Sequence, residues 1–127
     1  MDALRIKATR NTPEIYFDAS AGLLEMTGKS APENARDFYA KAFDWLENYF
    51  DRPNNKTIFN FKFQYYNTAT AKILLQMMLR IEDLFNSGFD ILIKWYFTED
   101  DEDMEEAGID YSDIVNIPFE IISVEDN

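Results

Sequence analysis

Residues 57–66, TIFNFKFQYY, carry the most regular pattern in the chain and determine its predicted architecture. The aromatic residues are Phe59, Phe61, Phe63 and Tyr65, and the polar residues between them are Asn60, Lys62 and Gln64. Side chains of a strand alternate between two faces, so this pattern predicts a strand with one buried aromatic face and one polar face. A sheet covered on both faces would show continuous apolar runs instead. The stretch therefore predicts a sheet whose helices lie mainly on one face.

Helical patterns flank this strand on both sides. Residues 30–33, SAPE, have the spacing of a capping box with proline in a first helical turn, and they predict a helix that runs to about Asp51. After the strand, a second helix is predicted from about Thr70 to Asn86, where Ser87 and a glycine follow. Its core stripe is Ile73, Leu74, Met77, Ile81, Leu84 and Phe85.

The rest of the chain adds further strands. Residues 13–28 predict two short strands around a turn at 20–22, and residues 90–97 and 118–124 each predict one more. The acidic stretch 99–108 predicts a short helix. Strand–helix–strand units imply parallel pairs with right-handed crossovers. Residues 1–127 are therefore predicted to form a single α/β domain, with a mixed β-sheet and helices mainly on one face.

Composition limits the class of protein. The chain has 127 residues, of which 46% are hydrophobic, so it is long and apolar enough for one packed domain. A net charge of −12 argues against nucleic acid and anionic membrane as partners, and permits basic proteins. There is no apolar run long enough for a membrane span, no signal-peptide core and no cysteine. These features predict a cytoplasmic protein.

The sequence also excludes several kinds of catalytic site. It contains no histidine and no cysteine, which removes Ser-His-Asp and Cys-His catalysis and the usual zinc sites. It has no glycine-rich phosphate loop. The acidic run from Glu99 to Glu106 lacks the glycine and the ligand spacing of an EF-hand. The prediction is a protein without cofactor, metal ion or enzymatic activity.

Two hydroxyl residues stand where the aromatic strand meets the second helix, in YYNTATAK, residues 65–72. In open parallel sheets functional groups collect beyond the carboxyl ends of strands, and a helix N-terminus favours a phosphate. Thr68 therefore has the position of a phosphoacceptor. The alternative is that Asn67, Thr68 or Thr70 simply caps the helix. The residues alone leave both interpretations open.

Several short motifs resemble one family along nearly the whole chain. They are Thr12-Pro13 before a strand, GKSAPENA at 28–35, YYNTATAK at 65–72 and PFEI at 118–121. With this order and spacing the chain resembles the SiaC family of bacterial regulatory phosphoproteins, which have a STAS-like fold. In the related anti-anti-sigma turn an acidic residue and a glycine stand where this chain has Asn67 and Thr70. An anti-anti-sigma factor that sequesters an anti-sigma kinase is the alternative.

The resemblance implies a switch protein. Thr68 would be phosphorylated by a cognate Ser/Thr protein kinase and dephosphorylated by a PP2C-type phosphatase. The unphosphorylated form would bind and activate an effector, a diguanylate cyclase, and so act in cyclic-di-GMP signalling and biofilm control.

A partner-binding surface is predicted around Thr68. Its expected members are Asn67, Thr70, Lys72, Leu75, Gln76 and Leu79, with Glu33 and Asn34 at the start of the first helix. Lys72, Leu75, Gln76 and Leu79 fall on the side of the second helix that is turned from its core stripe. Leu75 and Leu79 would then be partly exposed, which is typical of a contact patch. The alternative is that these leucines pack against the first helix.

Overall fold

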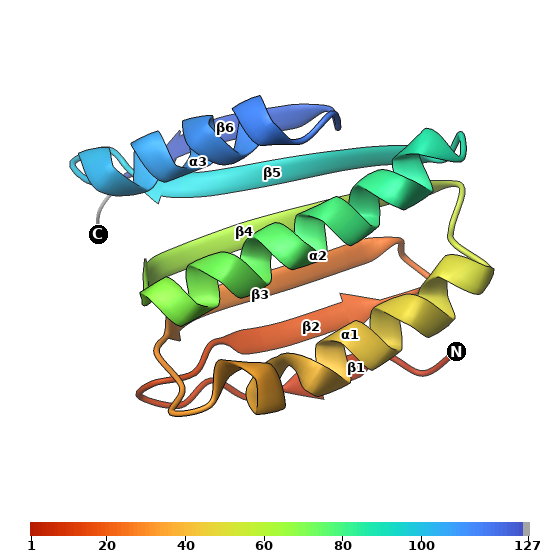
Figure 1. Ribbon diagram of the computed structural model, residues 1–127, viewed down its shortest axis with the longest axis horizontal. Helices are drawn as coiled ribbons and strands as arrows, with labels where there is room; N and C mark the ends of the chain where they lie inside the picture. The colour runs from red at the N-terminus through yellow and green to blue at the C-terminus, as the bar shows by residue number, and fades with distance from the viewer. Residues whose placement is uncertain (126–127) are drawn as a thin grey trace.

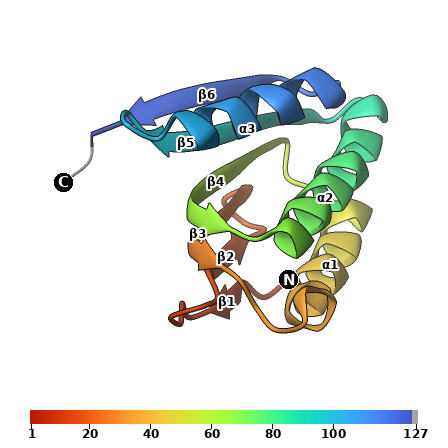
Figure 2. The ribbon, with the colours of Figure 1, turned by 60° about the vertical axis from the view of Figure 1, so that its left-hand side comes forward.

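The computed structural model describes residues 1–125, which form one curved sheet with helices on one of its faces (Figures 1 and 2). The strands are β1 (Leu4–Ile6), β2 (Glu14–Asp18), β3 (Leu23–Ser30), β4 (Lys56–Tyr66), β5 (Asp90–Thr98) and β6 (Phe119–Val124). The helices are α1 (Ala35–Asp51), α2 (Thr68–Asn86) and α3 (Glu102–Ile114). None of the helices within residues 1–125 is long and apolar enough to cross a membrane.

The strands follow one another in the sheet in the order in which they occur in the chain. β1, β2 and β3 pair antiparallel, whereas β3, β4, β5 and β6 pair parallel. Each parallel pair is joined by one helix, and right-handed crossovers between neighbouring strands place every such helix on the same side. Figure 2 shows α1, α2 and α3 on one side of the sheet. The predicted mixed sheet with one-sided helices is confirmed.

The aromatic face of β4 forms the centre of the core. Phe59 and Phe61 are fully buried, and their rings stack with centroids 4.3 Å apart. On the other face, the side chain of Lys62 is 37% exposed and forms an ion pair with Glu25. The predicted orientation of the strand is therefore correct over most of its length. Burial of several large aromatic side chains is the main source of stability here.

The prediction fails at the end of β4. Tyr65 was expected on the buried face, but it is 54% exposed. Phe63 pairs with Gly28 while Tyr65 pairs with the next residue, Lys29, so Gln64 is an extra residue in β4. Such a bulge reverses the alternation beyond it. Tyr66 consequently takes the buried side, where its ring meets the ring of Phe63 edge-on at 5.8 Å.

The predicted capping box at the start of α1 is also wrong. Ser30 is not a cap but the last residue of β3, where it pairs with Tyr66. The cap is Asn34, whose side chain accepts a hydrogen bond from the backbone N–H of Asp37 at 3.1 Å. Asparagine caps as well as serine does, and the strand pairing holds Ser30 in an extended conformation. α1 ends at Asp51 as predicted.

Three other elements differ from the expectation. α2 begins at Thr68, two residues before the predicted start. β1 was not predicted, because three residues are too few to show a periodicity. α3 is longer than the short helix expected, and it lies directly on Trp95, whose indole N–H donates to the carbonyl of Met104 at 2.9 Å. A Cβ atom at Gly108 would come within 2.4 Å of the Trp95 ring, so this close contact requires glycine.

Candidate functional site

Both long helices begin at the same end of the sheet, where β3 and β4 terminate. β3 and β4 are parallel, and their last residues, Ser30 and Tyr66, pair with each other. α1 and α2 each start a few residues later, with Asn34 and Asn67 as their N-caps. In Figure 1 both helix starts lie on the left of the molecule. This end of the sheet therefore carries two sets of helix N-terminal backbone N–H groups.

Thr68 is the first residue of α2 and its side chain is exposed. The side chain of Asn67 accepts a hydrogen bond from the backbone N–H of Thr70 at 2.9 Å, so the capping group of α2 is Asn67. Among the hydrogen bonds of residues 1–125, none involves the hydroxyl of Thr68. Of the three candidate caps, Asn67 performs the role and Thr68 is left facing solvent.

Thr70 has the opposite environment although it is only two residues further along. It is fully buried, and its hydroxyl donates to the backbone carbonyl of Ser30 at 3.2 Å. The same hydroxyl lies 2.8 Å from Ser30 Oγ, which in turn lies 2.7 Å from the hydroxyl of Tyr39. This hydroxyl cluster (Ser30, Tyr39 and Thr70) joins β3, α1 and α2. Thr70 was one of the three candidate caps of the helix, but its hydroxyl bonds to the backbone of β3 instead.

The protonation state of Tyr39 keeps the hydroxyl cluster neutral. Burial raises the pKa of Tyr39 to about 12, although its hydrogen bond to Ser30 acts in the opposite direction. Tyr39 therefore keeps its proton across the physiological range, and every member of the cluster can both donate and accept a hydrogen bond. The cluster has the character of a structural support beneath the start of α2, because its three residues are fully buried.

The predicted partner-binding residues divide into an exposed and a buried group. Lys72 and Gln76 are exposed, and Leu79 is 41% exposed. Leu75 is half-buried and packs against the core, so of the two leucines only Leu79 has the surface position expected of a contact residue. The structure thus gives Leu75 and Leu79 different exposure, although the helical pattern predicted the same for both.

The remaining predicted residues lie around the two helix starts. Glu33 and Asn34 are exposed at the start of α1, and Asn67 is half-buried at the start of α2. Thr70 lies beneath the surface with the hydroxyl cluster. Glu33, Asn34, Asn67 and Thr68 therefore share one edge of the molecule, while Lys72, Gln76 and Leu79 continue from it along α2.

Sequence reasoning missed the exposed aromatic side chain closest to Thr68 in the chain. Tyr65 follows the bulge, and it lines a pocket of about 320 Å³ together with Gln64, Tyr66, Asp101, Asp103, Met104 and Ala107. The bulge has no sequence signature here, so the alternation pattern assigned Tyr65 to the core. Ser30 and Tyr39 were also not recognised as a pair, because their side chains meet only in the folded chain.

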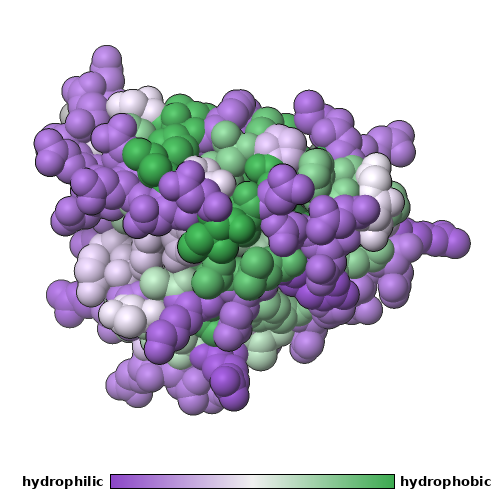
Figure 3. Space-filling view, turned by 45° about the horizontal axis from the view of Figure 1, so that its top comes forward, coloured by the Kyte–Doolittle hydropathy of each residue, from purple (hydrophilic) through white to green (hydrophobic). Residues whose placement is uncertain are grey.

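Some large apolar side chains are exposed on α2 and α3. Figure 3 shows a hydrophobic area bordered by hydrophilic side chains on the side of the molecule that carries α2 and α3. The large apolar side chains exposed on these two helices are Leu79, Ile109 and Ile114. Of these three residues, Leu79 is the one that belongs to the predicted partner-binding surface.

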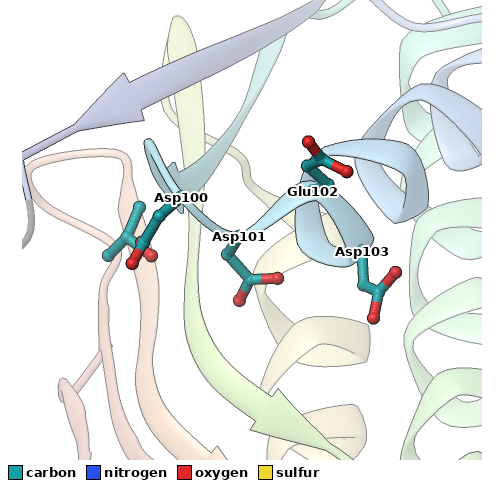
Figure 4. Close-up of a pocket in the computed structure, with 5 residues that line it drawn as sticks. Asp100, Asp101, Glu102 and Asp103 are labelled. Carbon is teal, nitrogen blue, oxygen red and sulfur yellow. The ribbon is translucent and has the colours of Figure 1, made fainter.

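The acidic side chains at the start of α3 do not form a metal site. Figure 4 shows Glu102 projecting to the opposite side from Asp101 and Asp103, with the carboxylates of Asp100, Asp101 and Asp103 spread apart. Asp101 serves as the N-cap of α3 and accepts from the backbone N–H of Met104 at 3.0 Å. Within residues 1–125 no group of three acidic side chains is arranged to hold a metal ion.

The mixed sheet with helices on one face defines a small STAS-like α/β domain, and an exposed threonine stands at the start of α2. The model of the SiaC family, described as regulatory phosphoproteins, matches residues 6–124, and the chain belongs to this family. The predicted family and the prediction of a regulatory protein rather than an enzyme are confirmed by this match.

Comparison with individual proteins gives the same result. An uncharacterized protein of Pseudomonas aeruginosa is 26% identical over 121 residues, which cover 95% of this chain and 96% of the relative. The structure of SiaC of Pseudomonas aeruginosa superposes with a TM-score of 0.89 at 25% identity and covers 98% of this chain and 100% of SiaC. A complex of the diguanylate cyclase SiaD with its activator SiaC, also from Pseudomonas aeruginosa, contains a chain that superposes with a TM-score of 0.90 at 26% identity, covering 95% of this chain and 99% of that one.

Proposed function

We propose that this protein is a cytoplasmic activator of a diguanylate cyclase, and that phosphorylation of Thr68 switches it off. The unphosphorylated form binds the cyclase through the edge around Thr68 and the exposed side of α2, and so raises cyclic-di-GMP synthesis. A cognate Ser/Thr kinase adds the phosphate and a PP2C-type phosphatase removes it. The similar SiaC of Pseudomonas aeruginosa is an activator in complex with the cyclase SiaD, which supports the choice of effector.

The observation that carries the proposal is the exposed, unengaged hydroxyl of Thr68 at the first position of α2. A kinase must reach the acceptor oxygen and turn it toward the γ-phosphate of ATP. Thr68 meets this requirement without any change in the fold. Thr70 does not, because its hydroxyl is buried and hydrogen-bonded to Ser30. Phosphorylation of Thr70 would require the start of α2 to unfold.

The start of α2 also lacks an acidic residue that would already interact with the helix N-terminus, so a phosphate could take this role. The first turns of α1 and α3 contain acidic residues, which interact favourably with the positive helix N-terminus, whereas the first turn of α2 contains none. A phosphate on Thr68 brings about 1.5 to 2 negative charges to this position. Lys72 is exposed one helical turn further on and adds a cation at the i+4 spacing. The phosphorylated chain should therefore remain folded.

The effect on the partner follows from the same charge. A surface that fits a neutral threonine would have to desolvate a hydrated dianion or be repelled by it. The change in stability of the chain is small, whereas the change in its surface is large. This difference is what a reversible switch requires.

The test uses the cyclase encoded by the same organism and measures cyclic-di-GMP production in its presence. The unmodified protein should activate the cyclase, and protein carrying phosphothreonine at position 68, introduced during synthesis, should not. Thr68→Val is the matched control, since it has the same shape and cannot be phosphorylated; it should activate with or without the kinase. Equal activation by the phosphorylated and unmodified proteins would contradict the switch, and no activation by either would contradict the choice of effector.

A second test concerns the acceptor. The protein is incubated with the kinase and ATP, and the modified residue is mapped by mass spectrometry. We expect a single phosphate on Thr68. A phosphate on Thr70 would overturn the assignment.

A further inference from the structure

The two edges of the sheet differ in how they are protected. β1, at one edge, has three residues with Arg5 in the middle. β6, at the other edge, has six residues, of which Glu120 is the single charged one. Edge strands are usually protected against further pairing by short length, lysine or proline. β1 is short and has a basic residue at its centre. β6 is longer, and its flanking Pro118 and its Glu120 stand at positions whose backbone faces β5, so they leave the outer backbone groups free.

The outer side of β6 presents a regular row of backbone groups. Within residues 1–125, β6 pairs with β5 alone. The carbonyl of Pro118 accepts from the N–H of Ile93, and the carbonyl of Val124 accepts from the N–H of Glu99, each at 3.0 Å. In a parallel ladder alternate residues direct both backbone groups to the same neighbour. Positions 118, 120, 122 and 124 therefore face β5. The N–H and C=O groups of positions 119, 121 and 123 face outward.

The charge of the molecule is concentrated next to this edge. Residues 1–98 contain 12 acidic and 12 basic residues, while residues 99–127 contain 12 acidic residues and no lysine or arginine. The whole net charge of −12 therefore comes from the part of the chain that forms α3 and β6. α3 packs on β5 and β6 and carries Glu102, Asp103, Glu105, Glu106, Asp110 and Asp113.

We propose that the free edge of β6 binds an extended segment of a basic partner protein, which adds to the sheet as a seventh strand. The segment alternates lysine or arginine with β-branched residues. Its backbone pairs with positions 119, 121 and 123, and its basic side chains lie close to the acidic residues of α3. Strand addition gives affinity through main-chain hydrogen bonds, and the charges select the partner.

The charge distribution argues against other occupants. A second copy of this chain would bring the same acidic surface to the contact and be repelled. A docked helix could not pair with a row of strand backbone groups, since its own are used internally. The site lies two strands from β4, whose end leads to Thr68, so the inference goes beyond the proposed function and does not depend on it.

The test uses a defined probe, a fluorescent peptide of seven residues with the sequence Lys-Val-Lys-Val-Lys-Val-Thr and blocked ends. Its binding is measured by fluorescence anisotropy, and its location by amide hydrogen exchange of the protein. The backbone N–H groups of Phe119, Ile121 and Ser123 should become protected when the peptide is present. The N–H groups of Glu120 and Ile122, already paired with β5, are the internal reference.

Two changes separate strand pairing from simple charge attraction. Ser123→Pro removes an outward N–H without breaking the ladder to β5, and should weaken binding by about tenfold or more, since it removes a hydrogen bond and obstructs the edge. Ser123→Thr keeps the N–H and should bind as the parent does. A peptide N-methylated at alternate residues keeps its charge and should lose affinity to a similar degree. This peptide leaves the protein unchanged, so it decides the question even if Ser123→Pro is destabilised.

Several outcomes would overturn the proposal. One is equal binding of the N-methylated peptide, which would mean that charge alone holds the probe. Another is protection that maps outside β6, and a third is the absence of binding. Equal binding of a peptide with glutamate in place of lysine would contradict the claim that the partner segment is basic. Self-association of the protein that Ser123→Pro abolishes would make a second copy the occupant.

Discussion

The starts of α1 and α2 lie at the same end of the sheet, and each is capped by an asparagine. The two starts nevertheless present different surfaces. Asn34 and Asn67 each accept a hydrogen bond from the third residue that follows. α1 has Asp37 in its first turn, whereas the first turn of α2 has no acid and begins with the exposed Thr68. The start of α2 is also tied to the core through Thr70. The comparison indicates that capping holds both helices, while the missing acid and the free hydroxyl distinguish the start of α2 from that of α1.

The largest expected effect is on stability at alkaline pH. The pKa of Tyr39 is raised to about 12 by burial, compared with 10.0 for an exposed tyrosine. The stabilisation is fully present below pH 10 and is lost as the pH rises through about 12, because the unfolded chain releases the proton first. Tyr39 should account for a loss of about 2 to 3 kcal/mol in this window, and Tyr111, whose pKa is also raised by burial, adds a loss of the same sign. Urea unfolding between pH 9 and 12 measures it.

The control for the alkaline effect is Tyr39→Phe, which should be less stable at neutral pH because Ser30 loses a hydrogen-bond partner, and should show a flatter decline. An equally steep decline in this variant would mean that other tyrosines, and not Tyr39, cause the alkaline loss of stability.

The next effect compares two threonines that stand two residues apart. Thr70→Val should lower the free energy of unfolding by about 1 to 3 kcal/mol, because Ser30 loses a buried hydrogen-bond partner. Thr68→Val has the same change in shape and should alter stability by less than about 0.5 kcal/mol. Chemical denaturation of both variants checks the difference. Equal losses would show that Thr68 supports the fold, and would weaken its role as a free acceptor.

The caps should contribute about equally to the two helices. Asn34→Ala and Asn67→Ala should each cost about 1 kcal/mol. Asn67→Ala should in addition change the rate of Thr68 phosphorylation, since it alters the start of α2. Thermal unfolding and a kinase assay on both variants measure the two effects. A cost confined to one helix would break the parallel between them.

A smaller effect tests the missing acid. Ala69 is exposed in the first turn of α2, and Ala69→Asp should stabilise the chain by about 0.3 to 1 kcal/mol at low salt through the helix N-terminus. The same substitution should weaken cyclase binding, because it places a negative charge beside Thr68. Ala69→Asn is the neutral control. A loss of stability at low salt would contradict the electrostatic interpretation of this helix start.

The smallest expected effect on stability concerns Leu79. It is 41% exposed, so Leu79→Asp should change the free energy of unfolding by less than about 0.5 kcal/mol, and it should weaken cyclase binding. Leu75→Asp should cost more, since Leu75 packs against the core. Calorimetric melting and cyclase binding of both variants test this order. Gross unfolding of Leu79→Asp would assign Leu79 to the core.

Local patterns predicted most of the fold, because the dominant interactions are periodic. The buried phenylalanines of β4 and the apolar stripe of α2 repeat at strand and helix spacing. The sequence predictions fail where a single contact, which belongs to no periodic pattern, determines the local structure. The bulge at Gln64 exposes Tyr65, and the strand pairing of Ser30 replaces the predicted cap. Both depend on neighbours far away in sequence, which a local pattern does not contain.

The exposure of Thr68 agrees with the sequence prediction, whereas the environment of its neighbours could not be predicted. The junction of a strand and a helix indicated Thr68, and its exposure agrees with that choice. The burial of Thr70 comes from its contact with Ser30, which lies 40 residues away. The different burial of Leu75 and Leu79 likewise depends on packing that a helical pattern alone does not specify.

The two tryptophans give the molecule a pair of optical reporters. Trp45 on α1 donates its indole N–H to the carbonyl of Asp2 at 2.8 Å, so it lies against the start of the chain. Trp95 lies beneath α3, in contact with Gly108 and hydrogen-bonded to Met104. A chain with one tryptophan replaced by phenylalanine would fluoresce from one end of the sheet alone. The emission wavelength of Trp95 would then report on the packing of α3. The emission wavelength of Trp45 would report on the attachment of the N-terminal strand.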